Sequence, residues 1–478
     1  MRTVRTIFVA TTVLIMLLFI LSCNKDNEEN NIDLSKLSDY ERINKFIIDG
    51  IRTYYFKADE TNWKQYDHRE ILSIDHEKLF NQLIHKDDKW SFITDDVEGE
   101  KDDSFFGVAN TFGYTLSFYH NPFVYDEVIA VVLYTMQFFP ASEAGLKRGD
   151  IIIELNGEKI TSNNYKELYY ASNISVRCGR LDIETESFTP LTEVKHLTSL
   201  RTFEREEQIY TLKIIEKEGH KIGYLLYNHF HIHNVDDLIR TLEILKNEGV
   251  NDVVLDLRFN RGGHFRIAQI LSSILAPEDV MKNKSVYLDH YYNNLYTSFL
   301  KNNDYSLSEY FIDLLPVNMN LKRLYVLTGK RTASASEATI AGLEPYMQII
   351  QIGDTTSGMF CNGMIISPED IYGKSNADYY KNFSNFGICI MNYRFDNIKG
   401  QNSFNGGLAP NVLATENDFD LIQLGDEDEP LLSIALAHIM GEPYSNATSV
   451  NPFPVIALPD IKKPVEGMFM TPQPLIQE

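Results

Sequence analysis

A serine stands at a point in the chain where its hydroxyl could act as a nucleophile. Residues 331–337 read Arg-Thr-Ala-Ser-Ala-Ser-Glu and lie between a predicted strand, Leu324–Thr328, and a predicted helix, Ser336–Tyr346. Open α/β folds bind ligands at the carboxyl ends of their strands, and the positive end of a helix dipole favours a nucleophile that gains negative charge. Ser334 is therefore a candidate nucleophile.

The same serine also has a purely structural explanation. Ser334 and Glu337 form an S-x-x-E pattern, the capping box that satisfies backbone groups at the start of many helices. A serine is expected at such a position for that reason alone. The local sequence leaves both roles open.

Two glycines follow another predicted strand. Gly262 and Gly263 come after Asp252–Leu257 and lead into a predicted helix. Because glycine has no Cβ, the backbone there could approach a substrate carbonyl and turn its N–H groups toward a developing oxyanion. A simple turn is the alternative. Just upstream, Asp256 and Arg258 are expected to form a structural pair that holds this loop.

Four stretches resemble the carboxyl-terminal processing peptidases, also called tail-specific proteases. They are residues 140–150 (PASEAGLKRGD), 221–224 (KIGY), 256–263 (DLRFNRGG) and 332–337 (TASASE). In that family the TASASE serine is paired with a lysine in a following G-E-T-x-x-G-K stretch. Here residues 353–359 read Gly-Asp-Thr-Thr-Ser-Gly-Met, so Ser334 matches the serine and Met359 falls on the lysine.

The resemblance runs from about residue 38 to about residue 442, and it fits the PDZ-containing lipoprotein branch of these serine peptidases. It implies an oxyanion hole made by a backbone N–H of the Gly262–Gly263 pair and that of Ala335. The family lysine accepts the serine proton as a neutral amine, because burial lowers its pKa. A methionine thioether cannot accept that proton.

Loss of the general base in a serine protease costs ~10⁴-fold or more in turnover. Two functions therefore stay open. One is a serine endopeptidase that acts through Ser334 with a rearranged base. The other is a catalytically impaired pseudo-peptidase that binds peptides, because the family lysine is Met359.

The favoured substitute base is His264, which directly follows the glycine pair, although a surface histidine at a helix start is the alternative. Tyr114 and Lys330 are weaker candidates. Three further histidines alternate along the chain without Asp or Cys at metal-ligand spacing. They are His229, His231 and His233, and we predict that they are groove-lining or exposed residues. Neither a metal nor another cofactor is expected.

Residues 105–216 have the short-strand pattern of a PDZ-like domain. Such domains bind an extended peptide by adding it as a strand and hold its terminal carboxylate with backbone N–H groups. The resemblance assigns the carboxylate-binding loop to Phe112, Gly113, Tyr114 and Thr115. The expected partner is a peptide or protein with an accessible C-terminus or an unfolded segment, and the alternative is a folded spacer that has lost binding.

The first 23 residues resemble a lipoprotein signal peptide. Two arginines precede an apolar run, Ile7–Ile20, and a lipobox-like end at Cys23. A transmembrane anchor is the alternative, but the run falls short of the ~20 residues that a spanning helix needs. Lipid on Cys23 and a tether over residues 24–37 therefore predict a cell-envelope protein on the outer membrane. The acidic start of the tether is similar to the signals that send some Gram-negative lipoproteins to the cell surface, which predicts a surface-exposed protein.

Composition limits the remaining possibilities. The net charge of −23 excludes a phosphate-backbone partner such as nucleic acid, which needs clustered Lys and Arg. Four cysteines, of which Cys23 is one, imply no disulfide framework. The predicted fold is multidomain α/β, with a peptidase core of the crotonase/Clp-protease-like type. Its parts are a helical domain (38–96), an acidic linker (95–103), the PDZ-like domain (105–216), the core (219–442) and a Pro-rich tail (443–478) without regular structure.

Overall fold

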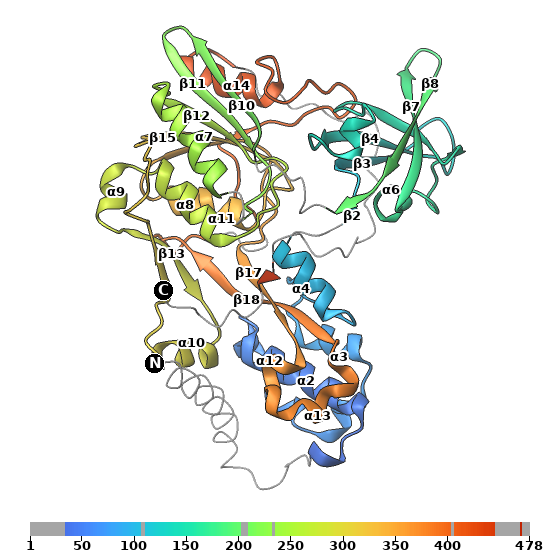
Figure 1. Cartoon of the computed structure of the whole chain (residues 1–478), viewed down its shortest axis with the longest axis vertical. Helices are drawn as coiled ribbons and strands as arrows, with labels where there is room; N and C mark the ends of the chain where they lie inside the picture. Colours follow the sequence, from blue (N-terminus) through green and yellow to red (C-terminus); the bar gives the residue numbers. More distant parts are fainter. Residues whose placement is uncertain are drawn as a thin grey trace.

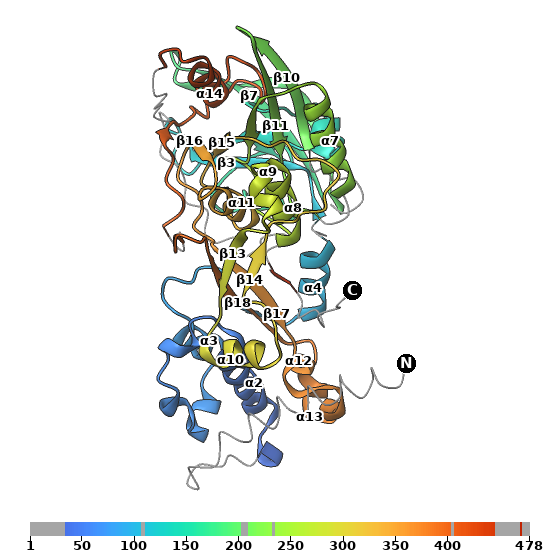
Figure 2. The same cartoon turned by 90° about the vertical axis from the view of Figure 1, so that its left-hand side faces the viewer.

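The computed structural model describes residues 34–106, 110–201, 209–231, 235–402, 406–444 and 469–470. Within these ranges three larger sheets carry the helices around them (Figure 1). The N-terminal helices lie at one end of the molecule, and the sheet with the candidate nucleophile lies toward the other (Figures 1 and 2). The signal peptide, Cys23 and most of the tether and tail fall outside the described residues.

The central sheet has the strand order β10-β11-β12-β15-β16-β19. Neighbouring strands from β11 onward are parallel. Its strands are β10 (Ile209–Lys217), β11 (His220–Tyr227), β12 (Asp252–Asp256), β15 (Arg323–Thr328), β16 (Gln348–Gly353) and β19 (Val412–Leu413), and its helices are α7 (Val235–Asn247), α8 (Phe265–Leu275), α11 (Ala335–Leu343) and α14 (Pro430–Met440).

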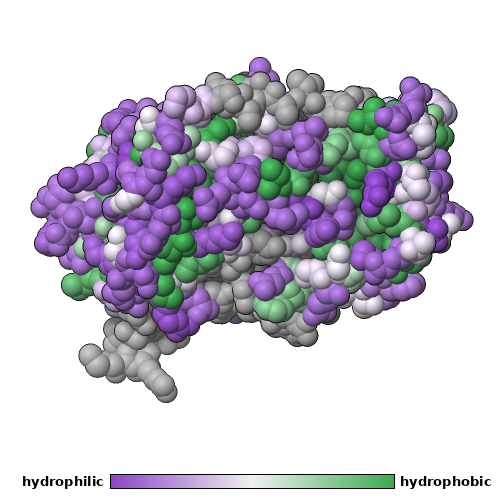
Figure 3. All heavy atoms as spheres, turned by 90° about the horizontal axis from the view of Figure 1, so that it is seen from above, coloured by the Kyte–Doolittle hydropathy of each residue, from purple (hydrophilic) through white to green (hydrophobic). Residues whose placement is uncertain are grey.

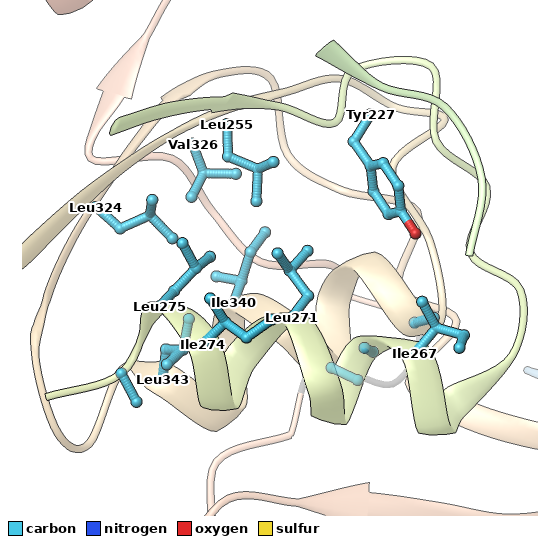
Figure 4. Packing of buried hydrophobic residues seen from close by; sticks show 14 of the residues in the cluster. Tyr227, Leu255, Ile267, Leu271, Ile274, Leu275, Leu324, Val326, Ile340 and Leu343 are labelled. Carbon is cyan, nitrogen blue, oxygen red and sulfur yellow. The ribbon is translucent and has the colours of Figure 1, made fainter. Parts of the chain in front are cut away.

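Both faces of this sheet are buried, which explains why its strands read as continuous apolar runs. Alternate residues of β11 enter different clusters. Leu225 and Tyr227 pack with residues of α7, α8 and α11, whereas Tyr224 and Leu226 pack with those of α14. Figure 4 shows the first of these clusters between the sheet and the two helices α8 and α11.

Strand β10 corrects one predicted boundary. It pairs antiparallel with β11 in the central sheet, although the PDZ-like domain was predicted to extend to residue 216. The two strands are joined at Glu218 and Gly219, whose φ angles are 50° and 82°. Two consecutive left-handed residues are the signature of a tight hairpin. An alternating strand pattern alone does not say to which sheet a strand belongs.

The second sheet forms an antiparallel β domain with the order β3-β4-β5-β7-β8. Strand β3 lies at its edge, and β2 pairs with β9 where the chain enters and leaves the domain. The elements are β2 (Asn110–Thr111), β3 (Tyr114–His120), β4 (Val128–Thr135), α5 (Pro140–Glu143), β5 (Ile151–Leu155), β6 (Glu158–Lys159), α6 (Glu167–Tyr170), β7 (Asn173–Asp182), β8 (Ser187–Thr198) and β9 (Leu200–Arg201).

The third sheet has the order β14-β13-β18-β17-β20, and β1 also pairs with β18. The stretch Pro277–Asn320 supplies two of these strands, β13 and β14. The elements are β1 (Phe92–Thr94), α9 (Glu278–Lys282), β13 (Val286–Tyr291), α10 (Asn294–Asn302), β14 (Ser308–Tyr310), β17 (Cys361–Ile366), α12 (Pro368–Tyr372), α13 (Ala377–Tyr380), β18 (Gly387–Asp396) and β20 (Phe469–Met470).

The N-terminal helices α2 (Asp39–Tyr54) and α3 (His76–Leu83) pack on this third sheet. A capping box begins α2, because Ser38 and Glu41 bond reciprocally. The predicted linker at Asp95–Asp103 is wrong, because Val97–Phe106 forms helix α4. Burial of Val97 stabilises the start of that helix, since its side chain is fully buried in the cluster that α2 and β18 share.

The tail also departs from the prediction at one point. Phe469–Met470 forms a short strand that pairs in parallel with Gly363–Met364 of β17. In the part of the chain that the structure describes, no helix is long and apolar enough to cross a membrane. Figure 3 shows a largely hydrophilic face with separate apolar patches, as the charge of −23 leads one to expect.

Candidate active site

Ser334 occupies the sharp turn between β15 and α11. Its backbone angles are φ 52° and ψ −113°, a strained conformation for a residue with a side chain. Thr332 stabilises this turn, because its hydroxyl donates to the carbonyl of Leu257 at 2.8 Å and accepts from the N–H of Gly329 at 3.0 Å. The serine is therefore fixed at the carboxyl end of the central sheet.

The glycine loop packs directly against this turn. A Cβ on Gly262 would lie 2.8 Å from the Cβ of Ser334 and 3.0 Å from the backbone nitrogen of Ala335. Gly262 and Gly263 have φ angles of 108° and 130°, which side-chain-bearing residues rarely adopt. The structure thus brings together Gly262, Ser334 and Ala335, which the sequence places in two distant segments.

Asn260 holds the glycine loop and was not singled out from the sequence. Its side-chain oxygen accepts from the N–H of Gly262 at 2.8 Å, and its side-chain nitrogen donates to the carbonyl of Tyr227 at 2.9 Å. Its own carbonyl accepts from the N–H of Ala333 at 3.2 Å and from the hydroxyl of Ser336 at 3.1 Å. An asparagine two residues before a glycine is a typical turn signal that could have indicated it.

The hydrogen bond between Asn260 and Gly262 also limits which backbone N–H groups could form an oxyanion hole. The N–H of Gly262 already has an acceptor inside the protein, at 2.8 Å. A donor for a substrate oxyanion would therefore be Gly263 of the glycine pair, together with Ala335 at the start of α11.

Glu337 does more than cap a helix. Its carboxylate accepts from the N–H of Ser334 at 2.9 Å, from the N–H of Gly358 at 2.8 Å and from the hydroxyl of Thr356. Burial raises the pKa of Glu337 to about 7, although these hydrogen bonds lower it. The Glu337 side chain therefore links the turn at Ser334 to the segment that ends at Met359.

Met359 is fully buried beside that turn. It lies in one apolar cluster with Ala333 and Cys361, and the nearby N–H of Ser357 donates to the carbonyl of Thr332 at 2.8 Å. Among the described residues, no basic nitrogen is within hydrogen-bond distance of the Ser334 hydroxyl. The residue that the resemblance aligns with the family lysine is thus a thioether in an apolar cluster.

His264 lies at the start of α8, next to Gly263. Its ring Nδ1 accepts from the backbone N–H of Arg266 at 3.2 Å, and its backbone N–H donates to the carbonyl of Phe230 at 2.6 Å. Burial lowers the pKa of His264 below its usual value, helped by the charge of His231. The imidazole is therefore kept neutral, and because Nδ1 accepts a hydrogen bond, the ring proton is on Nε2. Nε2 can act as a base only in the other tautomer, in which Nδ1 carries the proton and the bond from Arg266 is lost.

The other expected histidines differ from each other. His229 is buried, against the prediction of a groove-lining or exposed residue, and burial lowers its pKa to about 3. The rings of His229 and His231 are 6.0 Å apart, and His233 falls outside the described residues. In the described ranges no three His, Cys, Asp or Glu side chains form a group that could hold a metal ion.

The two weaker base candidates are used elsewhere. The hydroxyl of Tyr114 donates to the carbonyl of Leu168 inside the β domain. The Lys330 nitrogen lies 3.6 Å from a carboxylate oxygen of Asp354, and the lysine is largely exposed. Neither side chain bonds to Ser334.

The predicted carboxylate-binding loop, Phe112–Thr115, leads into β3. Gly113 has a φ of 77°, and its N–H donates to the Thr111 hydroxyl at 3.0 Å. Its carbonyl accepts from the N–H of Met136 at 2.7 Å. The loop is therefore closed by internal hydrogen bonds on both sides of Gly113.

The predicted pair of Asp256 and Arg258 is confirmed and belongs to a larger buried network. The Arg258 Nε donates to Asp256 at 3.0 Å, and both terminal nitrogens donate to Glu429, at 2.7 Å and 2.9 Å. Glu416 lies 3.0 Å from Arg258 and also bonds to Arg148 of the β domain. Burial alone would raise the pKa of Glu429, but the Arg258 guanidinium lowers it to about 2.

The fold and the site define a class of protein. Residues 221–413 match the family model described as peptidase family S41. These residues form a peptidase S41 domain, and the chain is homologous to the carboxy-terminal processing proteases.

Two curated relatives illustrate this homology. The chain is 30% identical over 226 residues to the carboxy-terminal processing protease CtpB of Bacillus subtilis. The aligned residues make up 46% of this chain and 42% of the relative. It is 26% identical over 232 residues to the carboxyl-terminal-processing protease of Picosynechococcus sp., covering 48% and 51%. The chain thus spans about half the length of the curated relatives it matches.

Two solved structures share the fold. A candidate S41 protease from Bacteroides fragilis superposes with a TM-score of 0.63 and 24% identity, over 83% of this chain and 97% of the other. The photosystem II D1 C-terminal processing protease superposes with a TM-score of 0.50 and 16% identity, over 84% and 98%. Mixed α/β sheets are common to these structures and to this chain.

Gly262→Ala tests how closely the glycine loop is packed. We expect it to lower the free energy of unfolding by at least about 2 kcal/mol more than Gly157→Ala, because a new Cβ would overlap Ser334 in addition to the backbone strain. Gly157 is a matched control, since its φ is also positive and nothing lies within 4 Å of the added Cβ. Urea denaturation measures both, and equal losses would contradict the packing argument.

Proposed function

We propose that the protein is a serine-type peptidase of the carboxyl-terminal processing type that cleaves peptide or protein substrates through Ser334. One observation carries the proposal. Ser334 is held at a strained φ of 52° directly against a glycine loop. Such strain costs of order 1–3 kcal/mol and persists where a site needs it.

In this proposal the Ser334 hydroxyl attacks the substrate carbonyl, and the N–H groups of Gly263 and Ala335 stabilise the oxyanion. His264, a neutral imidazole that follows Gly263 directly, takes the serine proton on Nε2. This step needs the tautomer with the ring proton on Nδ1, so the bond from the N–H of Arg266 to Nδ1 is given up when substrate binds. Hydrogen bonds of catalytic groups are often long before substrate binds. Turnover is low, since His264 is not bonded to Ser334 in the free protein.

Met359 favours a second candidate function. A fully buried thioether at the lysine position leaves Ser334 without its usual partner. The chain would then be a pseudo-peptidase that binds extended peptides in the cleft and the β domain. The PDZ-like nature of that domain is part of both candidates, supported by its edge strand and the loop at Gly113.

A fluorophosphonate probe separates the two candidates, because it phosphonylates only a serine whose proton is removed. We expect one adduct by intact-protein mass spectrometry in the wild type, none in Ser334→Ala and at least tenfold slower labelling in His264→Ala. Absence of labelling in the wild type would leave the binding function. Unchanged labelling in His264→Ala would eliminate His264 as the base.

We also propose that lipid on Cys23 attaches the protein to the outer membrane. The supporting observation is the sequence of the first 23 residues, with an apolar run that ends at this cysteine. Cys23→Ala should move the protein from the membrane to the soluble fraction, because a lipid chain adds about 0.8 kcal/mol for each buried CH₂ group. Immunoblots of fractions after a high-salt wash measure this, and a variant that stays in the membrane would refute it.

A further inference from the structure

Arg331 connects the nucleophile turn to the β domain. It lies three positions before Ser334, and its Nη2 donates to the carbonyl of Leu116 in β3 at 3.0 Å. Burial lowers the pKa of Arg331, while Tyr169 of α6 is the group beside it that most favours the charge. A cation of the core therefore reaches across to the edge strand of another sheet.

Tyr169 bonds to the same residue of β3, on the same open edge of the strand. The N–H of Leu116 donates to the Tyr169 hydroxyl at 3.0 Å. The Tyr169 ring also contacts the rings of Tyr114 and Phe118, with centroid separations of 6.1 Å and 5.9 Å. The space between β3 and α6 is thus filled by an aromatic side chain of the domain itself.

These two bonds use the outward-facing backbone groups of an edge strand. Strand β3 pairs with β4 on one side, and its other side has no strand in the described part of the sheet. In a strand, the N–H and C=O of one residue point to the same side, so a peptide added to this edge needs both groups of Leu116. The protein itself already occupies both.

We propose that Arg331 plugs the β3 edge, so that a peptide adds to β3 only when Arg331 leaves Leu116. Binding in the β domain is therefore coupled to the turn that carries Ser334, because the same arginine belongs to both. Thermodynamic coupling of this kind is reciprocal, and whatever fixes the turn also closes the edge. The inference rests on the peptide-binding part of the proposed function and not on catalysis by Ser334.

Peptide affinity tests the plug. All variants carry Ser334→Ala to prevent cleavage, and the probe is a fluorescein-labelled ten-residue peptide of alanine and serine that ends in Val-Ile-Val. We expect Arg331→Ala to bind it about tenfold more tightly in fluorescence anisotropy, because a larger fraction of the variant is already in the binding-competent state, without Arg331 on Leu116. Lys330→Ala is the matched control, since this neighbouring cation is exposed and faces Asp354.

Equal affinity of the two alanine variants would overturn the proposal, and so would absence of binding in both. Thermal unfolding checks that each variant is folded. If Arg331→Ala does not fold, Tyr169→Phe gives the same test, because it frees the N–H of Leu116 and leaves the arginine in place. Affinity unchanged by that substitution would contradict a self-occupied edge.

Hydrogen exchange tests the coupling in a protein with native Arg331. Saturating peptide should raise deuterium uptake in fragments that cover residues 329–334, because release of Arg331 removes a bond that holds this turn. Unchanged uptake at full occupancy would show that the peptide binds without moving Arg331. Fluorophosphonate labelling is measured separately, so a failure of Ser334 chemistry does not alter either result.

Discussion

Met359→Lys is expected to raise cleavage of unfolded casein by about 10²-fold over the wild type, because a positioned base contributes about that much or more. Met359 is fully buried in an apolar cluster, so a lysine there would have a lowered pKa and a sizeable neutral fraction. The Glu337 carboxylate, which bonds the adjacent N–H of Gly358, would partly oppose this by favouring the charged amine.

Two controls make this result specific. Ser334→Ala in the same background should abolish the gain. Met364→Lys places an amine in the same buried cluster, on β17, at a position that does not match the family lysine. If Met364→Lys raised the activity equally, loosening of the cleft and not a restored base would explain both. A wild type already as active as Met359→Lys would refute the view that the base is missing.

Arg258→Met is expected to lower the free energy of unfolding by about 3–5 kcal/mol, because it leaves buried carboxylates without their cation. Asp256 and Glu429 are fully buried, and both bond to this guanidinium. The loss should shrink as the pH falls, since without Arg258 burial raises the pKa of the Glu429 carboxyl and its neutral form is favoured in the folded state.

Arg240→Met is the matched control for that experiment. Arg240 pairs with Asp237 on the surface of α7, where both side chains are more than half exposed. Such pairs contribute about 0–1 kcal/mol. Chemical denaturation of the two variants should therefore differ by several kcal/mol, and similar losses would show that the buried network adds nothing to stability.

Local patterns predicted much of the core. The predicted strands Leu324–Thr328 and Asp252–Leu257 differ from β15 and β12 by one residue at most at each end, because each is a short apolar run. The predicted helix Ser336–Tyr346 begins within one residue of α11 but extends past its end at Leu343. The closeness of Ser334 and Gly262 was implied by the family resemblance, and it agrees with the rule that parallel strands present their carboxyl ends at one edge of a sheet.

Long-range partners could not be predicted. Glu429 and Glu416 reach Arg258 from segments far along the chain, and nothing in their local sequence marks them as its partners. Asn260 was not singled out from the sequence, whereas four of its hydrogen bonds join β11, the glycine loop and the turn at Ser334. The assignment of β10 failed for a similar reason, since pairing partners are set by tertiary contacts.

The pairing of β1 with β18 has a consequence for the order of events during synthesis. Phe92–Thr94 pairs with Gly387–Cys389, and the cluster around α2 contains residues from both ends of the chain. When the ribosome has made only the first hundred residues, α2 has no sheet on which to bury Phe46 and Ile51. A chain with such late partners folds slowly and exposes apolar surface while it waits. Its N-terminal helices therefore complete their packing only after the segment that contains Ser334 has been made.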